Sequence, residues 1–414
     1  MQLWCLIWHV FFIIMIKDIE IQQKAKEFQI DTSDLQRDYV FGWLLSGIYN
    51  QSPLSNQLIL KGGSSLRKAY LKNTRFSKDL DFSVIDSVDP HTLVRQLNDV
   101  CLYAQDRSGI KFEVDETRVI HKPVFDREQR QVFEARLYFN SFYKKEEIII
   151  KVQLDVTTFD KILLPPQTIQ LIHPYSDVDV CTAMLRCQKL EEILASKLNA
   201  LIQRRKASDL FDLVYAIFFS NQFAVHRGEV ITTFLKKTIY EPDPLAAKNL
   251  LLSVPAEEHR PFWKKIVAPV ASIFDFDAGV VRFRELVNNL FTLVPASVPA
   301  LVSPGISAPG RLTGYGGYAS VNYFPSGMRD VLISAGRSNT LVQLTYDGYT
   351  RLVEPYAFEY RVRKKDGVGM EYFWGWDQSG GKSGKTGIKM FISDKIESVS
   401  STGFSFNPRF QVEL

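Results

Sequence analysis

A glycine-rich turn followed by a closely spaced acidic pair is the feature that most constrains the fold of this chain. The turn spans residues 61–65 (KGGSS), and the pair is Asp79 and Asp81. Glycines allow backbone amides to approach a phosphate closely, and a serine adds a hydroxyl donor. Two aspartates separated by one residue on a strand point to the same face, where they are costly unless a cation lies between them. The pattern therefore predicts a site for phosphate and a divalent metal, with metal-assisted nucleotidyl transfer as its chemistry.

Short elements around the turn are expected to hold these groups in place. Residues 58–60 predict a strand that enters the turn, and a helix is expected to begin at Ser64, where its N-terminal amides could hold an anion. Residues 79–84 predict the next strand. Upstream, residues 15–50 are expected to form helices with a break, after which Ser33 would act as the cap.

A later segment offers a third carboxylate. Residues 147–157 alternate apolar and polar side chains, which predicts a strand with one polar face, and Asp155 lies on that face with Lys151. Beside Asp79 and Asp81, Asp155 would complete a cluster that could hold two metals and help to deprotonate an attacking hydroxyl. The alternative is a surface strand with a solvated polar face.

The helix predicted over residues 189–205 carries a lysine on its apolar stripe. An inward-facing Lys197 needs a partner or a task, and triphosphate binding and a structural salt bridge are the two options. Asp209 and Asp212 lie one turn apart on the next helix and could pair with Lys197 or oppose the helix dipole. The basic run 204–206 could contact triphosphate or RNA backbone, or form a solvated turn.

Composition sets broad limits. The chain has 414 residues, of which 46% are hydrophobic and 23% charged, so it is typical of globular proteins and long enough for two or three domains. Its net charge of +4 permits a nucleic-acid partner without requiring one. The four cysteines and six histidines lack zinc-ligand spacing, so we expect reduced thiols, a cytoplasmic location and no zinc site.

The first residues, 1–14, form an apolar stretch. It is too short for a stable membrane span and lacks the basic start and cleavage site of a signal peptide. We interpret it as an upstream extension from a misassigned start. A peripheral anchor or a buried N-terminal helix is the alternative.

Changes in composition divide the rest of the chain. Residues 15–180 are expected to form the core that carries the site, and 181–295 a helical domain that completes it. Residues 296–324 are rich in Pro, Gly and Ser and read as a linker, after which 325–414 show short β-like runs.

In this order, the motifs resemble those of the AbiEii/AbiGii-type nucleotidyltransferase toxin family, which belongs to type IV toxin–antitoxin systems. The resemblance covers about residues 15–290 and rests on the segments 61–68, 75–81, 154–157, 192–201 and 209–213. It implies an α+β fold, with a DNA polymerase β-like nucleotidyltransferase core and a helical C-terminal half. It also implies Mg²⁺ (or Mn²⁺) as the cofactor, an NTP as substrate, RNA as acceptor and a cognate antitoxin as partner.

The family's functional residues carry over to matching positions of this chain. The resemblance implies that the metal is held by Asp79, Asp81 and Asp155, and that Lys197 and Asp212 form a catalytic pair. Nucleotide binding is implied for a set that combines the turn with the helical half, namely Gly62, Gly63, Ser64, Ser65, Lys197 and Asp209. Ser77 stands two positions before the first metal aspartate, where some relatives are phosphorylated to silence the enzyme.

The C-terminal part, residues 325–414, resembles a WYL domain. Such domains are small SH3-like β-barrels that sense ligands, often nucleotides or nucleic acids. The resemblance rests on residues 344–356, 372–377 and 391–396. It implies a nucleotide or nucleic-acid ligand for this domain, and a structural module for oligomerisation is the alternative.

The sequence thus predicts a Mg²⁺-dependent nucleotidyltransferase toxin that transfers nucleotides from NTP to RNA, at the 3′ acceptor end of tRNA, in a toxin–antitoxin or phage-defence system. Two alternatives stay open. One is transfer to a small-molecule or protein hydroxyl, and the other is a catalytically idle nucleotide-sensing scaffold.

Overall fold

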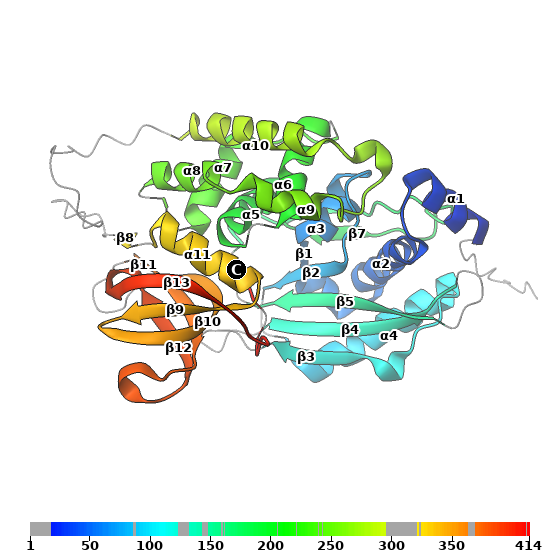
Figure 1. The fold of residues 1–414 in the computed structure, drawn as a ribbon. Helices are drawn as coiled ribbons and strands as arrows, with labels where there is room; N and C mark the ends of the chain where they lie inside the picture. Colours follow the sequence, from blue (N-terminus) through cyan, green and yellow to red (C-terminus); the bar gives the residue numbers. More distant parts are fainter. Residues whose placement is uncertain are drawn as a thin grey trace, which may run out of the picture.

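Two β-sheets and a layer of helices make up the structure (Figure 1). The computed structural model describes residues 18–85, 88–122, 132–142, 148–158, 160, 162–204, 206–220, 222–238, 240–241, 243–294, 321–322, 324–362, 369–410 and 412–414. The apolar stretch 1–14, Arg205 and most of the expected linker 296–324 lie outside these residues. Within the described part of the chain, no helix is both long enough and apolar enough to cross a membrane.

The first sheet has seven strands in the order β3-β4-β5-β2-β1-β7-β6. They are β1 (Leu58–Lys61), β2 (Asp79–Val84), β3 (Arg118–Lys122), β4 (Val132–Asn140), β5 (Ile149–Thr157), β6 (Gln167–Gln170) and β7 (Met184–Cys187). Strand β2 lies at the centre because it pairs antiparallel with β1 and parallel with β5. Strand β7 lies inside the region expected to be helical. It belongs to the sheet because it pairs in parallel with β1, which four residues of sequence are too few to reveal.

Helices α2 (Thr32–Gln51) and α4 (Pro90–Ser108) pack against each other on one face of this sheet, and α1 (Asp18–Phe28) precedes α2. The side chain of Asp31, in extended conformation, accepts the N–H of Ser33 at 2.7 Å. The N-cap of α2 is therefore Asp31, and the expectation of Ser33 was wrong. Both residue types cap helices, so only the backbone conformation identifies the cap.

The helical half follows the sheet in the sequence and shares its core. Its helices are α5 (Leu190–Gln203), α6 (Ala207–Val214), α7 (Arg227–Lys237), α8 (Pro244–Leu252), α9 (Arg260–Trp263) and α10 (Phe276–Phe291). Helix α5 contacts α6 and α7, and α10 lies across α6, α7 and α8 (Figure 1). One cluster of buried apolar side chains runs from Leu154 in the sheet to Leu286 in α10. The two halves expected as separate domains therefore stabilise each other through a common core.

The C-terminal part forms a second sheet of six strands with one helix. The elements are β8 (Val321–Asn322), α11 (Ser326–Arg337), β9 (Thr340–Tyr346), β10 (Tyr349–Val362), β11 (Gly369–Asp377), β12 (Gly387–Ile392) and β13 (Ile396–Ser405). Their order is β12-β11-β10-β9-β13, with β8 paired to β11. Strand β10 is continuous over residues 349–362, and its pairing with β11 shifts register at a bulge between Pro355 and Ala357. The apolar core of this C-terminal unit is separate from the core that the first sheet shares with the helical half. The SH3-like and WYL-like identity remains an expectation.

A buried ion cluster fixes the chain just after the glycine turn. The carboxylate of Asp38 in α2 accepts from Arg67 at 2.6 Å and from Lys68 at 2.9 Å, and all three side chains are almost completely buried. Burial opposes ionisation of Asp38, but the two cations outweigh it and hold its pKa well below the usual range. The guanidinium of Arg67 also lies 3.5 Å from the ring centroid of Phe76. These contacts join α2 to two segments that follow the turn.

We expect Asp38→Asn to lower the free energy of unfolding by about 3 kcal/mol or more, because it leaves two buried cations without their carboxylate. Asp34→Asn is the matched control on the same helix. Its ion pair with Arg37 is partly exposed, so its loss should cost less than about 1 kcal/mol. Urea unfolding of the two variants measures the difference. Equal losses would show that the buried cluster does not stabilise the fold.

Candidate active site

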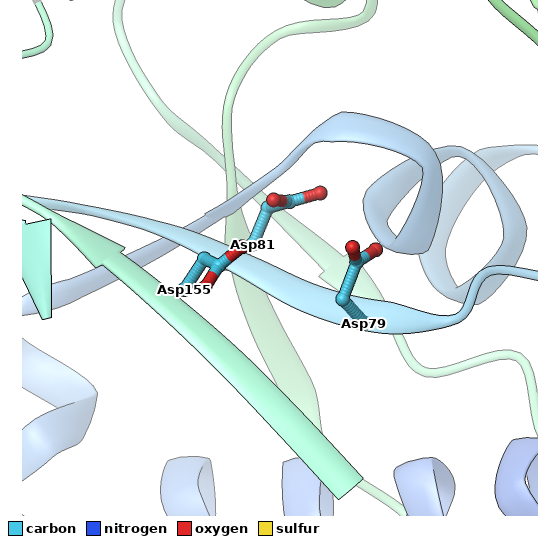
Figure 2. Close-up of side chains that lie close together, drawn as sticks. All are labelled: Asp79, Asp81 and Asp155. Carbon is cyan, nitrogen blue, oxygen red and sulfur yellow. The ribbon is translucent and has the colours of Figure 1, made fainter. Parts of the chain in front are cut away.

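Three carboxylates gather on two neighbouring strands at the centre of the first sheet. In the parallel pairing of β2 with β5, Asp81 lies directly opposite Asp155, and Asp79 stands two residues earlier on β2. One oxygen from each of the three carboxylates lies within 4.8 Å of the other two (Figure 2). The flanking Leu80 and Phe82 point to the other face and are fully buried. The strand alternation thus places Asp79, Asp81 and Asp155 together, as the sequence predicted.

The cluster is electrostatically costly without a cation. Burial raises the pKa of Asp81 to about 7, and the charges of Asp79 and Asp155 add to this effect. Lys61 and Lys197 oppose the shift but do not cancel it. Three half-buried carboxylates with only oxygen donors suit a hard divalent cation such as Mg²⁺ or Mn²⁺. The donor set therefore fits a divalent metal of the kind that the sequence predicted.

The glycine turn forms a one-turn helix, α3 (Gly62–Ser65), beside the carboxylates. Gly62 has φ +67°, and a Cβ atom on it would lie 2.4 Å from Oδ2 of Asp81. The Ser64 hydroxyl accepts the backbone N–H of Asp81 and donates to the carbonyl of Lys61, each at 3.2 Å. Ser64 and Ser65 are both buried, so their hydroxyls point into the protein. Phosphate binding by Gly62, Gly63, Ser64 and Ser65 stays a prediction, and the backbone amides are the donors available for it.

A chain of buried ion pairs connects the turn to the helical half. Lys197 of α5 contacts Asp209 at 2.7 Å and Asp212 at 2.9 Å, both on α6. Asp212 also accepts two hydrogen bonds from Arg75, each of 2.8 Å. Arg204 donates to Asp209 at 3.0 Å. The two aspartates predicted as partners of Lys197 are both its partners.

Arg75 is the functional candidate that the sequence analysis missed. A Cβ atom on Gly63 would lie 2.6 Å from its guanidinium, so Gly63 makes room for this arginine. With Asp212 bound on its other side, Arg75 links the turn to α6. Its position inside the segment 75–81 was a signal, but nothing in that spacing points to a partner 137 residues away.

A second ion pair lies beside the carboxylates. Lys61 pairs in register with Asp81, and its ammonium contacts Asp160, which follows β5. Asp160 also accepts from the hydroxyl of Ser83 at 2.8 Å. Burial opposes ionisation of Asp160, but Lys61 outweighs it and lowers its pKa. Lys61 therefore lies between the cluster and a fourth carboxylate that the sequence analysis did not identify.

Comparison with known protein families identifies the family to which the chain is similar. The model of the family described as nucleotidyl transferase AbiEii toxin, type IV TA system, matches residues 43–279. No curated protein matches the chain.

Solved structures that resemble the chain include two bacterial proteins. MenT4, a nucleotidyltransferase toxin from Mycobacterium tuberculosis, has 18% identity and a TM-score of 0.43 over 66% of this chain and 89% of its own. JHP933 from Helicobacter pylori has 16% identity and a TM-score of 0.38 over 63% of this chain and 92% of its own.

The raised pKa of Asp81 predicts how the metal-free protein responds to pH. The pKa rises from 3.8 to about 7 on folding, so the folded state keeps a proton that the unfolded state has released. This contribution to stability is present in acid and is lost as the pH rises through about 7. We therefore expect Asp81→Asn to be more stable than wild type at about pH 8, by on the order of 1 kcal/mol or more. At about pH 5 the difference in stability between the variant and wild type should be smaller.

Thermal unfolding with and without Mg²⁺ or Mn²⁺ measures this effect. The cation should raise the Tm of wild type at about pH 8 and leave Asp81→Asn nearly unchanged. Asp106→Asn, on the exposed side of α4, is the matched control and should respond to the cation like wild type. If neither cation changes the Tm of wild type, the result contradicts the metal site.

Proposed function

The chain belongs to the AbiEii family of nucleotidyltransferase toxins, and from this premise we propose that it transfers a nucleotide from an NTP to the 3′ hydroxyl of RNA, at the acceptor end of tRNA. The observation that supports it best is the cluster of Asp79, Asp81 and Asp155 directly beside the glycine turn. Nucleotidyl transfer needs a place for a triphosphate next to a group of metal-binding carboxylates. In the proposed site the glycine turn would hold the triphosphate, and the three aspartates would hold the metal.

In the proposed reaction the 3′ oxygen of the RNA forms a bond to the α-phosphorus of the NTP. The bond from that phosphorus to the bridging oxygen breaks, pyrophosphate leaves, and the hydroxyl proton is lost. A divalent cation held by Asp79, Asp81 and Asp155 would supply positive charge against the charge that develops on the phosphoryl oxygens. Gln153 donates to both oxygens of Asp155, at 3.2 and 3.3 Å, and so orients this carboxylate to accept the proton.

The buried ion pairs suggest a positioning role for Lys197, Asp209 and Asp212. Lys197 is 6% exposed and already binds both aspartates, so direct contact with a triphosphate would require it to leave one of them. We propose instead that it holds Asp212, which holds Arg75 against Gly63. This chain of contacts would keep the amides of α3 in place for the phosphates.

RNA labelling tests the proposal. Purified wild-type protein with radiolabelled NTP, Mg²⁺ and total tRNA should produce labelled tRNA, and Asp79→Ala should abolish the label because the cluster loses a metal ligand. Asp106→Ala, on the exposed side of α4, should label like wild type. Sequencing of RNA 3′ ends would then identify the acceptor and the added nucleotide.

The outcomes separate the alternatives. Labelled product that is not RNA would favour a small-molecule or protein acceptor. Nucleotide binding without any labelled product would favour a nucleotide-sensing scaffold. Equal labelling by Asp79→Ala and wild type would contradict the proposed site.

We also propose that phosphorylation of Ser77 silences the enzyme. The Ser77 hydroxyl donates to Asp79 at 3.2 Å, so a phosphoryl group there would add negative charge at the metal ligands and compete for the cation. Ser77→Glu should therefore lower RNA labelling by on the order of tenfold or more, whereas Ser77→Ala should retain most of it. Equal activity of the two variants would exclude this role. A cognate antitoxin and a role in phage defence are further expectations of the family.

A further inference from the structure

Lys61 lies on the same face of the first sheet as the metal-binding carboxylates. Strands β1 and β2 are neighbours in the sheet, and their antiparallel pairing places Lys61 directly opposite Asp81. Side chains that are directly opposite in such a pair point to one face, with their Cβ atoms about 5 Å apart. Asp81 in turn lies opposite Asp155 on β5. Three neighbouring strands therefore present one lysine and two carboxylates side by side, and the glycine turn begins at the residue after the lysine.

A short chain of polar contacts fixes the partner of this lysine. The ammonium of Lys61 contacts the carboxylate of Asp160, which also accepts the hydroxyl of Ser83 at 2.8 Å. The side-chain amide of Gln188 donates to that hydroxyl oxygen at 3.3 Å. Ser83 and Gln188 are both buried, so they hold Asp160 from the protein side. The lysine is thus bound by a carboxylate that is not one of the three metal-ligand candidates.

Of the two lysines near the cluster, Lys61 is the one that can exchange its partner. Lys197 is bound by two carboxylates that are almost completely buried, those of Asp209 and Asp212. Among the described residues, the ion-pair partner of Lys61 is Asp160 alone, whose side chain is 32% exposed. A partly exposed ion pair contributes little to stability, whereas breaking a buried pair leaves an uncompensated charge. Lys61 can therefore release its carboxylate for another anion at a lower cost than Lys197.

A triphosphate beside three aspartates needs positive charge from the protein as well as from a metal. The phosphates and the carboxylates repel one another, and the backbone amides of the glycine turn carry no net charge. An ammonium group offers a full positive charge and three donors on a flexible stem. Hydrogen bonds between such a cation and a phosphate oxygen are stronger than those of neutral donors. Lys61 places such a group between the turn and the cluster.

We propose that Lys61 exchanges Asp160 for an oxygen of the β- or γ-phosphate when the NTP binds, and that Asp160 holds the lysine in the nucleotide-free protein. This rests on the proposed function in taking an NTP as substrate, but it does not depend on the acceptor. A nucleoside monophosphate has neither the β- nor the γ-phosphate, so Lys61 would bind only the triphosphate form. The pair of Lys61 and Asp160 would thus distinguish the substrate from the monophosphate.

Nucleotide binding without RNA tests the proposal. Isothermal titration calorimetry of the full-length protein with Mg²⁺ gives the Kd of ATP, GTP, CTP and UTP, and competition against the tightest of them gives the Kd of its monophosphate. Lys61→Ala should weaken NTP binding by about tenfold or more, because one charge-assisted hydrogen bond is lost, and should leave monophosphate binding unchanged. Lys61→Arg keeps the charge and should restore most of the affinity for NTP.

Asp160→Asn gives a second test with the opposite sign. It removes the carboxylate that competes with the phosphate for Lys61, so it should tighten NTP binding. The gain should be smaller when Lys61 is already alanine, because Asp160 acts through that lysine. A purely structural ion pair would instead make both single variants bind NTP more weakly. Unchanged or weaker NTP binding by a folded Asp160→Asn variant would therefore overturn the proposal.

Lys24→Ala is the matched control. Lys24 is a partly buried lysine whose ammonium lies 4.0 Å from the carboxylate of Glu20 on α1, and the variant should bind NTP like wild type. The measured quantity is the ratio of the Kd of the monophosphate to that of the NTP. Equal ratios for Lys61→Ala and Lys24→Ala would overturn the proposal. A cooperative thermal transition that Mg²⁺ shifts upward shows that each variant is folded.

The labelling assay keeps the two proposals apart. If wild type binds NTP but labels no RNA, the RNA acceptor fails and the role of Lys61 is still decided by the binding ratios. If wild type labels RNA but Lys61→Ala keeps the wild-type ratio, only the role of Lys61 fails.

Discussion

Mutual repulsion of three carboxylates is the constraint around which this structure is organised. Asp79, Asp81 and Asp155 lie within 4.8 Å of one another at the centre of a sheet, and burial with like charge raises the pKa of Asp81 to about 7. The fold offsets part of this cost with the positive charges of Lys61 and Lys197, which lower the pKa of Asp81. A cluster of this kind favours the binding of a divalent cation by the folded protein even without substrate.

The two lysines are themselves held by further carboxylates outside the cluster. Lys61 binds Asp160, and Lys197 binds Asp209 and Asp212. The charge is thus spread over two sets of side chains, which come from β1, α5, α6 and the segment after β5. Because Asp212 also binds Arg75 beside Gly63, the glycine turn and the helical half cannot move independently without breaking a buried ion pair.

Alternation along the strands made the cluster predictable. Residues 79–84 and the strand that contains Asp155 have short, regular patterns, and their side-chain directions follow from backbone geometry alone. The lysine on the apolar stripe of α5 was predictable for a similar reason, since an inward-facing charge needs a partner. Long-range partners were not predictable: the contact of Arg75 with Asp212 and that of Lys61 with Asp160 join residues about a hundred or more positions apart. Local composition also could not distinguish Asp31 from Ser33 as the cap of α2.

The amino-acid sequence by itself determined which chemistry the chain can carry, because the residue types and their spacing decide which carboxylates share a face. Tertiary structure alone decided how the site is supported and approached. It explains why positions 62 and 63 are glycines: Gly62 makes room for Asp81, and Gly63 makes room for Arg75. It also brought Arg337 of the C-terminal unit to Glu258 of the helical half, at 3.0 Å. These contacts depend on the packing of distant segments, and no local pattern encodes the distance between residues that only folding brings together.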